Sequence, residues 1–272
     1  MASKAQPPRQ QKHLAVLIDA DNAPAAIVEG LFEEIAKYGV ASVKRIYGDW
    51  TLPNLGGWKK VLLDYSIQPI QQFAYTRGKN ATDSSLIIDA MDLLYTRRFD
   101  GFCLVSSDSD FTRLAARLRE EGLEVIGFGE AKTPSPFVSA CDKFIYTEIL
   151  RADAAEAQTE PTAASDKPPA SAQSEQLTEP AKAADKPKTQ KVPVDFIAKV
   201  IEDINDEDGW IHLGALGSNI SKLRPAFDAR LYGFRKLSDL IKGHPKRFEL
   251  QVRGSSATGG EALYVRNRKV GK

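Results

Sequence analysis

The stretch that most constrains the fold of this chain is the apolar run 14–18, which ends abruptly in Asp19, Asp21 and Asn22. An uninterrupted apolar run bounded by polar residues is typical of a strand covered on both faces, as in the parallel sheets of α/β domains. In such sheets, ligands bind at the carboxyl ends of the strands, and these carboxylates would lie there. The run therefore predicts a buried parallel strand that ends at a binding site.

The same arrangement recurs at residues 102–110, where a short apolar strand is followed by Asp108 and Asp110. Between the two segments, Asp83 stands at the start of an expected helix that runs to about Tyr95. Three separated segments would thus bring carboxylates to one sheet edge, where unpaired acids repel one another and need a cation. For any single Asp, a helix cap or a solvated loop is a fair alternative, and Asp108 stands where a cap is expected. The convergence of all three segments predicts a metal site.

Strands and helices continue to alternate up to about residue 150. Pro69 places the third strand near a sheet edge or a bulge, because proline cannot donate to the strand ladder. Alternation over this length predicts a three-layer α/β domain with a mainly parallel sheet, at residues 12–151. After the first strand, the expected strands are residues 41–47, 67–74, 102–105, 123–128 and one near 144.

The composition changes sharply after this domain. In residues 152–191, Ala, Pro, Glu, Lys, Thr, Ser and Gln dominate, and Leu177 is the one large aliphatic residue. Such a segment cannot bury enough apolar surface to offset its chain entropy, which predicts a disordered linker. Residues 192–268 return to globular patterning, and helices followed by a hairpin indicate a small winged-helix module. Its expected elements are helices near 196–204, 216–223 and 231–241, and a hairpin of 248–252 with 263–265.

Charge is unevenly distributed along the chain, although the net charge is only +1. From Gly209 to the C-terminus there are 13 basic and 4 acidic side chains, hence +9, whereas the residues before it carry 24 and 32, hence −8. A basic module is a candidate for nucleic-acid binding. Aromatic residues among basic ones supply base stacking and phosphate attraction, although Phe234 and Leu237 also have the spacing of a core face. The basic stretch consists of Lys222, Arg224, Arg230, Arg235 and Lys236, with Tyr232 and Phe234 between them.

The remaining features indicate the compartment. Cys103 and Cys141 lie in expected core elements without metal-ligand spacing, which indicates buried thiols in a reducing cytoplasm rather than a disulfide. The polar N-terminus up to His13 contains no stretch that resembles a signal peptide. No apolar run approaches the length of a membrane span. We therefore expect a soluble, cytoplasmic protein with no membrane partner.

Two sets of motifs resemble known families. Asp19-Ala-Asp21-Asn22, Gly78-Lys79-Asn80-Ala-Thr-Asp83 and Ser106-Ser-Asp108-Ser-Asp110-Phe111 resemble the NYN domain family, the PIN-like nuclease group that includes bacterial LabA-like proteins. Gly209-Trp-Ile-His-Leu213, Arg235-Lys-Leu-Ser-Asp-Leu240 and Phe248-Glu-Leu250 resemble the LOTUS (OST-HTH) winged-helix family. The pairing of these two domains is itself known from the family.

The resemblance implies a ribonuclease that depends on Mg²⁺ or Mn²⁺. Such ions prefer hard oxygen ligands, activate water, orient a phosphate and offset charge on the leaving oxygen. The resemblance implies Asp19, Asp83 and Asp108 as the main metal ligands, with Asp110 as a further acidic member. Asn22 would hold a bridging water or a phosphate oxygen.

Other residues take lesser roles in this hypothesis. Lys79 would contact a phosphate, although a solvated loop lysine is an equal alternative. Ser106 and Ser107 would donate to the ligand carboxylates or to phosphate. Asp89 lies roughly 120° around the helix from Asp83, at about 100° per residue, so we expect it to be structural. In the rear module, the expected RNA contacts are Lys222, Arg224, Arg235 and Lys236.

The expected partner is RNA, and since known LOTUS modules bind RNA or protein helicases, a protein partner stays open. PIN-like domains often pair through sheet-edge helices, but no residue pattern here decides for or against a homodimer. A rival enzyme is a haloacid-dehalogenase-type phosphatase with Asp19 as nucleophile and Asp21 as acid, but its usual Thr or Val two places after the second Asp is missing. The rival outside enzymes is a non-cleaving RNA-binding adaptor, although no expected acidic position is replaced.

Overall fold

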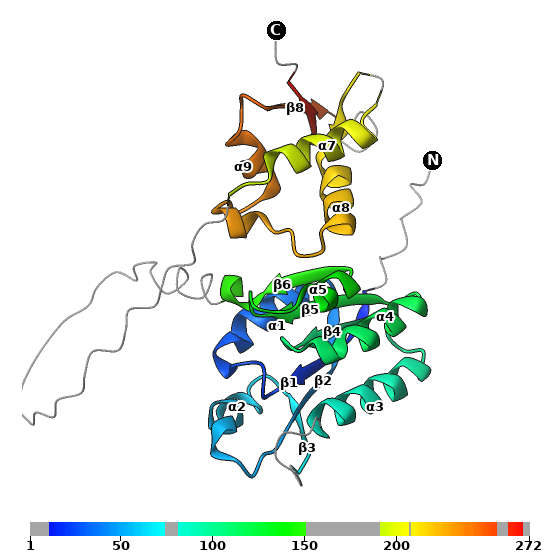
Figure 1. Ribbon diagram of the computed structural model, residues 1–272, viewed down its shortest axis with the longest axis vertical. Coiled ribbons are helices and arrows are strands. Elements are labelled where there is room, and N and C mark those ends of the chain that lie inside the picture. Colours follow the sequence, from blue (N-terminus) through cyan, green and yellow to red (C-terminus); the bar gives the residue numbers. More distant parts are fainter. Residues whose placement is uncertain (1–10, 74–80, 151–190, 207, 255–260, 269–272) are drawn as a thin grey trace, which may run out of the picture.

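The computed structural model describes residues 11–73, 81–150, 191–206, 208–254 and 261–268. Its first domain contains a six-stranded sheet in the order β3-β2-β1-β4-β5-β6, and every strand pairs in parallel with its neighbours (Figure 1). The strands are β1 (His13–Asp19), β2 (Val40–Gly48), β3 (Gln68–Gln71), β4 (Gly101–Val105), β5 (Glu124–Gly129) and β6 (Lys143–Tyr146).

Helices cover both faces of this sheet, which confirms the three-layer α/β prediction. Alternate residues of β1 enter separate cores because successive side chains of a strand point to opposite faces. Val16 packs in one core with Leu31 and Trp58, whereas Leu17 packs in the other with Ala90 and Leu118. The helices are η1 (Ala25–Ile27), α1 (Val28–Ala36), η2 (Pro53–Leu55), α2 (Gly56–Val61), α3 (Ala81–Tyr95), η3 (Ser109–Phe111), α4 (Thr112–Glu120) and α5 (Ser135–Ala140).

The local predictions hold for most of this domain. Pro69 lies in β3, an outer strand of the sheet, as its missing N–H predicts. Cys103 and Cys141 are buried and free, as expected. Helix α2 ends at Val61, and the residues that follow it turn, with Ser66 at a positive φ of 51°.

The second domain is a small α+β unit. Strands β7, β9 and β8 form an antiparallel sheet, and the buried side chains of Ile197, Leu216, Leu240 and Val265 belong to one core between it and the helices. The helix expected at 231–241 is instead divided in two, because Gly233 adopts a left-handed φ of 81° between η4 and α9. The elements are α7 (Val194–Ile204), β7 (Ile211–His212), α8 (Leu213–Leu223), η4 (Ala229–Tyr232), α9 (Leu237–Lys242), β8 (Phe248–Gly254) and β9 (Glu261–Asn267).

Two predictions from the sequence concern regions that are barely or not at all described. The expected disordered linker, 152–191, lies outside the described residues except for its last one. Lys79 also lies outside them. Among the helices that are described, none combines the length and the apolar character needed to cross a bilayer.

Candidate metal centre at the carboxyl edge of the sheet

The candidate site lies at the point between β1 and β4 where the strand order of the sheet changes direction. From β1 the chain continues to β2 on one side, while β4 pairs with β1 on the other side, with Ile18 opposite Val105. Such a switch point leaves a crevice at the carboxyl ends of the two strands. Asp19, the last residue of β1, and Ser106, which directly follows β4, are in contact: the Ser106 hydroxyl donates to Asp19 Oδ2 at 2.8 Å.

Asp19 is fully buried and held in place by three donors. Besides Ser106, the amide of Asn22 donates to Asp19 Oδ2 at 2.7 Å, and the backbone N–H of Asp21 donates to Oδ1 at 3.1 Å. Burial raises the pKa of Asp19 above its ordinary value, and these hydrogen bonds only partly offset that effect. The contacts fix the orientation of a carboxylate whose charge is costly to bury.

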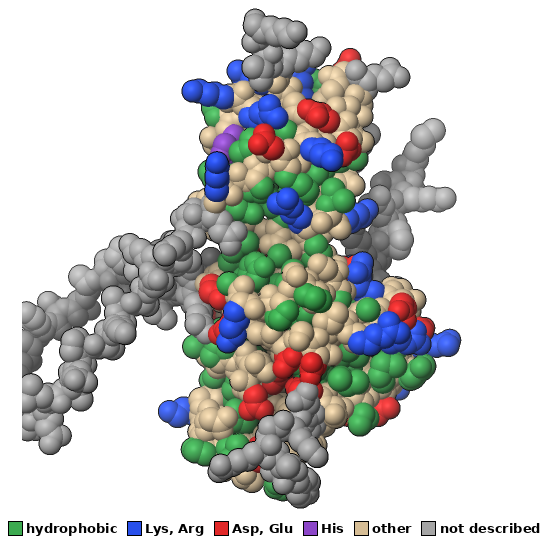
Figure 2. Space-filling model, in the orientation of Figure 1, with side chains coloured by type: hydrophobic (Ala, Val, Ile, Leu, Met, Phe, Trp, Pro, Cys, Tyr) green, Lys and Arg blue, Asp and Glu red, His purple; other side chains and the backbone are tan. Residues whose placement is uncertain are grey.

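Three further carboxylates converge beside it. Asp83, from the first turn of α3, and Asp108 and Asp110, from the turn after β4, each offer an oxygen, and these oxygens lie within 4.8 Å of one another. Burial raises the pKa of Asp83 to about 6, and the charges of Asp19, Asp108 and Asp110 add to the effect. Figure 2 shows acidic side chains gathered on one part of this domain. Crowded carboxylates of this kind suit a hard cation such as Mg²⁺ or Mn²⁺.

The predicted ligand set and this trio, Asp83, Asp108 and Asp110, overlap but differ. Asp19 is not one of the three, and its two oxygens already accept the three hydrogen bonds described above. Asp108 also acts as the N-cap of η3, because its Oδ1 accepts from the N–H of Asp110 at 2.9 Å. Capping and ion binding are compatible, since a carboxylate has a second oxygen.

Of the two serines expected to donate to the ligand carboxylates or to phosphate, one has a carboxylate partner and the other does not. Ser106 donates to a carboxylate, as the sequence predicts. Ser107 is buried, and its Oγ instead accepts from the backbone N–H of Glu130 at 2.9 Å, which ties it to the loop after β5. Asp89 accepts from Arg45 and from the hydroxyl of Tyr47, each at 2.9 Å, and this confirms a structural role.

One acidic residue at this edge was not singled out from the sequence. Asp49 directly follows β2, and its charge, after burial, contributes to a raised pKa of Asp21. Its Oδ1 accepts from Thr51 and from the side chain of Gln71. The signal, an acid at a strand end, was present in the sequence, but a single acid after one strand did not distinguish it from a turn residue.

A cavity of about 430 Å³ opens beside the acidic edge. Asp21 and Asn22 line one side of it, Trp58 lies at its apolar part, and Glu130 and Lys132 come from the loop after β5. Its volume lies within the range of small-ligand pockets, although its lining is more polar than is usual for them. Asp83, Asp108 and Asp110 do not line this cavity, which adjoins the edge on the side of Asp21.

The basic residues of the second domain are spread over different surroundings. Arg235 and Lys236 are exposed, whereas Lys222 lines a cleft of about 1130 Å³ together with residues of the first domain. The guanidinium of Arg224 lies 3.9 Å from the ring centre of Phe196. Arg230, a member of the expected basic stretch, is paired with Glu34 of the first domain.

A second group of basic and aromatic side chains in this domain was not predicted from the sequence. Arg253 lies over the rings of Trp210 and Tyr264, at 4.9 and 4.6 Å from their centres, and Arg266 lies 4.5 Å from that of Trp210. Such cation–π contacts hold guanidinium groups beside aromatic faces. Arg253, Tyr264 and Arg266 belong to the β8–β9 hairpin, but Trp210 lies more than forty residues before them, so no local pattern groups all four.

Comparisons with known proteins assign both domains. The NYN domain model matches residues 13–150, and the OST-HTH/LOTUS domain model matches residues 185–259. A search of the curated proteins gives no significant match.

A structure of a protein of unknown function from Vibrio parahaemolyticus is 17% identical, with a TM-score of 0.43, and covers 51% of this chain and 94% of its own. An NMR structure of an uncharacterized protein from Nitrosomonas europaea is 36% identical, with a TM-score of 0.30, and covers 37% of this chain and 96% of its own. With one model matched over half of its length and a second behind it, the chain belongs to the NYN domain family and carries an OST-HTH/LOTUS domain after its NYN domain.

Proposed function

We propose that this protein is a divalent-metal-dependent ribonuclease that hydrolyses phosphodiester bonds of RNA. The observation that carries the proposal is the convergence of Asp83, Asp108 and Asp110 within 4.8 Å at the carboxyl edge of a parallel sheet. Membership of the NYN family, a PIN-like nuclease group, supports the same reaction class. Asp83, Asp108 and Asp110 would hold Mg²⁺ or Mn²⁺, which would supply water activation and charge compensation at the phosphate.

The residues of the chain have distinct tasks in this reaction. Asp19 presents a carboxyl group next to the trio, oriented by Asn22 and Ser106. The cavity beside the edge accommodates a nucleotide next to the scissile phosphate. Water attacks the phosphate in line, and no covalent intermediate with the enzyme forms. The LOTUS domain binds the RNA, and its exposed Arg235 and Lys236 contact phosphates.

The phosphatase alternative is less well supported by the surroundings of Asp19. A nucleophilic carboxylate must reach the phosphorus atom, yet Asp19 is fully buried and accepts three hydrogen bonds. The adaptor alternative requires that the acidic edge hold a metal without cutting. It predicts metal binding and RNA binding with no product under any metal.

A cleavage assay on the full chain separates these functions. We compare the wild type with Asp83→Asn in Mn²⁺, Mg²⁺ or EDTA, and use Asp92→Asn as the matched control, because Asp92 is an exposed residue of the same helix. The expected result is metal-dependent cleavage by the wild type and the control, and none by Asp83→Asn. RNA that is bound but never cut would establish the adaptor instead, and equal cleavage by Asp83→Asn would remove Asp83 from the site.

A further inference from the structure

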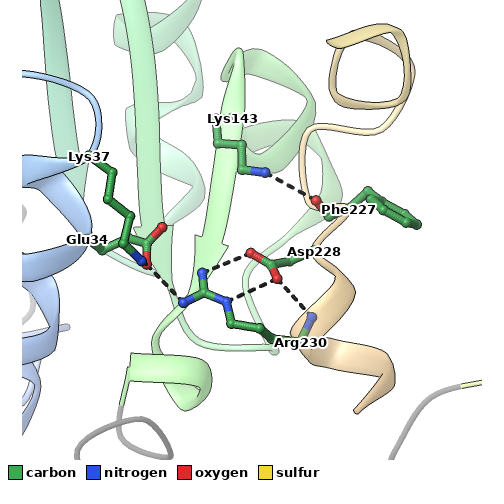
Figure 3. A network of polar contacts seen from close by, with 6 residues as sticks. All are labelled: Glu34, Lys37, Lys143, Phe227, Asp228 and Arg230. Atoms are coloured by element: carbon green, nitrogen blue, oxygen red, sulfur yellow. Dashed lines mark hydrogen bonds and ion pairs between the residues drawn. The ribbon is translucent and has the colours of Figure 1, made fainter. Parts of the chain in front are cut away.

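The two domains meet in a network of charged side chains (Figure 3). Arg230, from η4 of the LOTUS domain, donates through Nη1 to Oε2 of Glu34, on α1 of the NYN domain, at 2.9 Å. The side chain of Glu34 is only 5% exposed and that of Arg230 18%. Each has a partner in its own domain as well: Lys37 donates to Glu34 at 2.7 Å, and Arg230 donates to both oxygens of Asp228.

Backbone groups of the LOTUS domain complete the contact with the outer strand β6. The N–H of Phe144 in this strand donates to the carbonyl of Pro225 at 2.9 Å. The ammonium of Lys143 donates to the carbonyl of Phe227 at 3.2 Å, and burial lowers its pKa. Ala226, between these two carbonyls, packs against the apolar core of the NYN domain. The segment 225–230 therefore supplies two carbonyls, one apolar side chain and one guanidinium to the same surface.

Free movement of the two domains would separate these groups. Burying a charge is costly unless it is paired and hydrogen-bonded, and Glu34 reaches that state with Lys37 and Arg230 together. In separated domains, Glu34 would keep Lys37 and Arg230 would keep Asp228, so the docking joins two surfaces that are each already paired. The fit is selective, because a partner surface without an acceptor for Nη1 of Arg230 would bury that guanidinium N–H without the bond that Glu34 accepts here.

We propose that segment 225–230 is a docking element that binds β6 and α1 of the NYN domain of the same chain, with Arg230 as its specificity-determining residue. Docking holds the LOTUS domain in one orientation relative to the acidic edge, so that the two domains act as one unit. Residues 151–190 separate the domains in sequence, and a connection of this length also permits docking on a second copy. We favour docking within one chain because a linker gives the tethered surface an effective concentration of up to roughly millimolar.

Hydrogen exchange at the amide of Phe144 reports this docking directly, because its acceptor is the carbonyl of Pro225. We measure exchange by NMR on the full chain for the wild type, Arg230→Ala and Glu34→Gln. The two variants change opposite domains, so a shared effect reflects the contact and not the unfolding of one domain. The reference amide is that of Ser106, which donates to Phe128 inside the NYN sheet. The control variant is Arg113→Ala, which removes an exposed ion pair with Glu120.

We expect the amide of Phe144 to be protected in the wild type and in Arg113→Ala, and to exchange at least about tenfold faster in both docking variants. The amide of Ser106 stays protected in all four proteins. Light scattering is expected to give a monomer. A Phe144 amide that exchanges freely in the wild type, or equal protection in all variants, would overturn the proposal. A dimer whose dilution exposes the Phe144 amide would assign the same surface to docking between two copies and overturn docking within one chain.

Discussion

The acidic edge and the domain junction both contain charged side chains in partly or fully buried positions. The edge brings like charges together, whereas the junction pairs opposite charges. At the edge, Asp83 faces other carboxylates, and its pKa is raised to about 6. At the junction, burial raises the pKa of Asp228, but the hydrogen bonds and charge of Arg230 outweigh that effect and leave it below its ordinary value. The junction thus pairs opposite charges, whereas the edge brings like charges close together, an arrangement that is common at functional sites.

The strongest test of this contrast removes one carboxylate from the edge. Asp108→Asn or Asp110→Asn is expected to lower ribonuclease activity by more than about 100-fold, because loss of a residue that only supports a metal ligand already costs roughly 10–100-fold. Titration calorimetry with Mn²⁺ should show weaker binding in the same variants. Full activity in both would mean that like charges at this edge have no catalytic role.

The matching test at the junction removes one charge from a pair of opposite sign. Arg230→Ala is expected to lower the free energy of unfolding by about 2 kcal/mol, less than the roughly 3–5 kcal/mol for breaking a fully buried pair, because Lys37 still neutralises Glu34. Chemical denaturation measures this change. Arg113→Ala, at an exposed ion pair, should stay within about 0.5 kcal/mol of the wild type. Equal effects of the two substitutions would show that burial adds nothing at the junction.

A serine pair sharpens the comparison within the edge itself. The Ser106 hydroxyl orients the Asp19 carboxylate, whereas the Ser107 hydroxyl holds a backbone N–H of the loop after β5. Ser106→Ala is therefore expected to lower activity by about tenfold, because it leaves a buried carboxylate with one donor fewer. Ser107→Ala should affect thermal stability more than activity. Steady-state kinetics and thermal melts of both variants measure these effects. A larger loss of activity in Ser107→Ala than in Ser106→Ala would contradict the prediction.

The smallest expected effect concerns stability without metal. The pKa of Asp83 in the folded protein, about 6, exceeds its ordinary value of 3.8, so the folded state binds more protons between these values and stability falls as pH rises through them. Asp83→Asn removes this titration and is expected to stabilise the protein in EDTA at pH 7 by about 1 kcal/mol, a figure reduced for solvent screening. Added Mn²⁺ should stabilise only the wild type. Chemical denaturation in EDTA at pH 4.5 and pH 7 measures the difference in the free energy of unfolding between the two proteins. An Asp83→Asn variant less stable than the wild type at pH 7 would contradict the prediction.

The acidic edge could be predicted from the sequence because the pattern that marks it, an apolar strand followed by acids, is local. An apolar run followed by acids places Asp19 and Asp108 at strand ends, and the parallel sheet then brings the ends together. The same reasoning missed Asp49, and it assigned Arg230 to a basic stretch for RNA. The pairing of Arg230 with Glu34 joins residues 196 positions apart, and no periodicity or spacing carries information about such a contact.

The covering of β6 has a consequence for how the protein behaves in concentrated solution. The unpaired backbone of an outer strand is a template on which other chains can add strands and aggregate. At one outer strand, β3, Pro69 has no N–H to donate. At the other outer strand, β6, the N–H of Phe144 donates to the carbonyl of Pro225. Docking of the second domain on β6 therefore covers part of this outer strand and leaves less of its backbone open to strand addition by another chain.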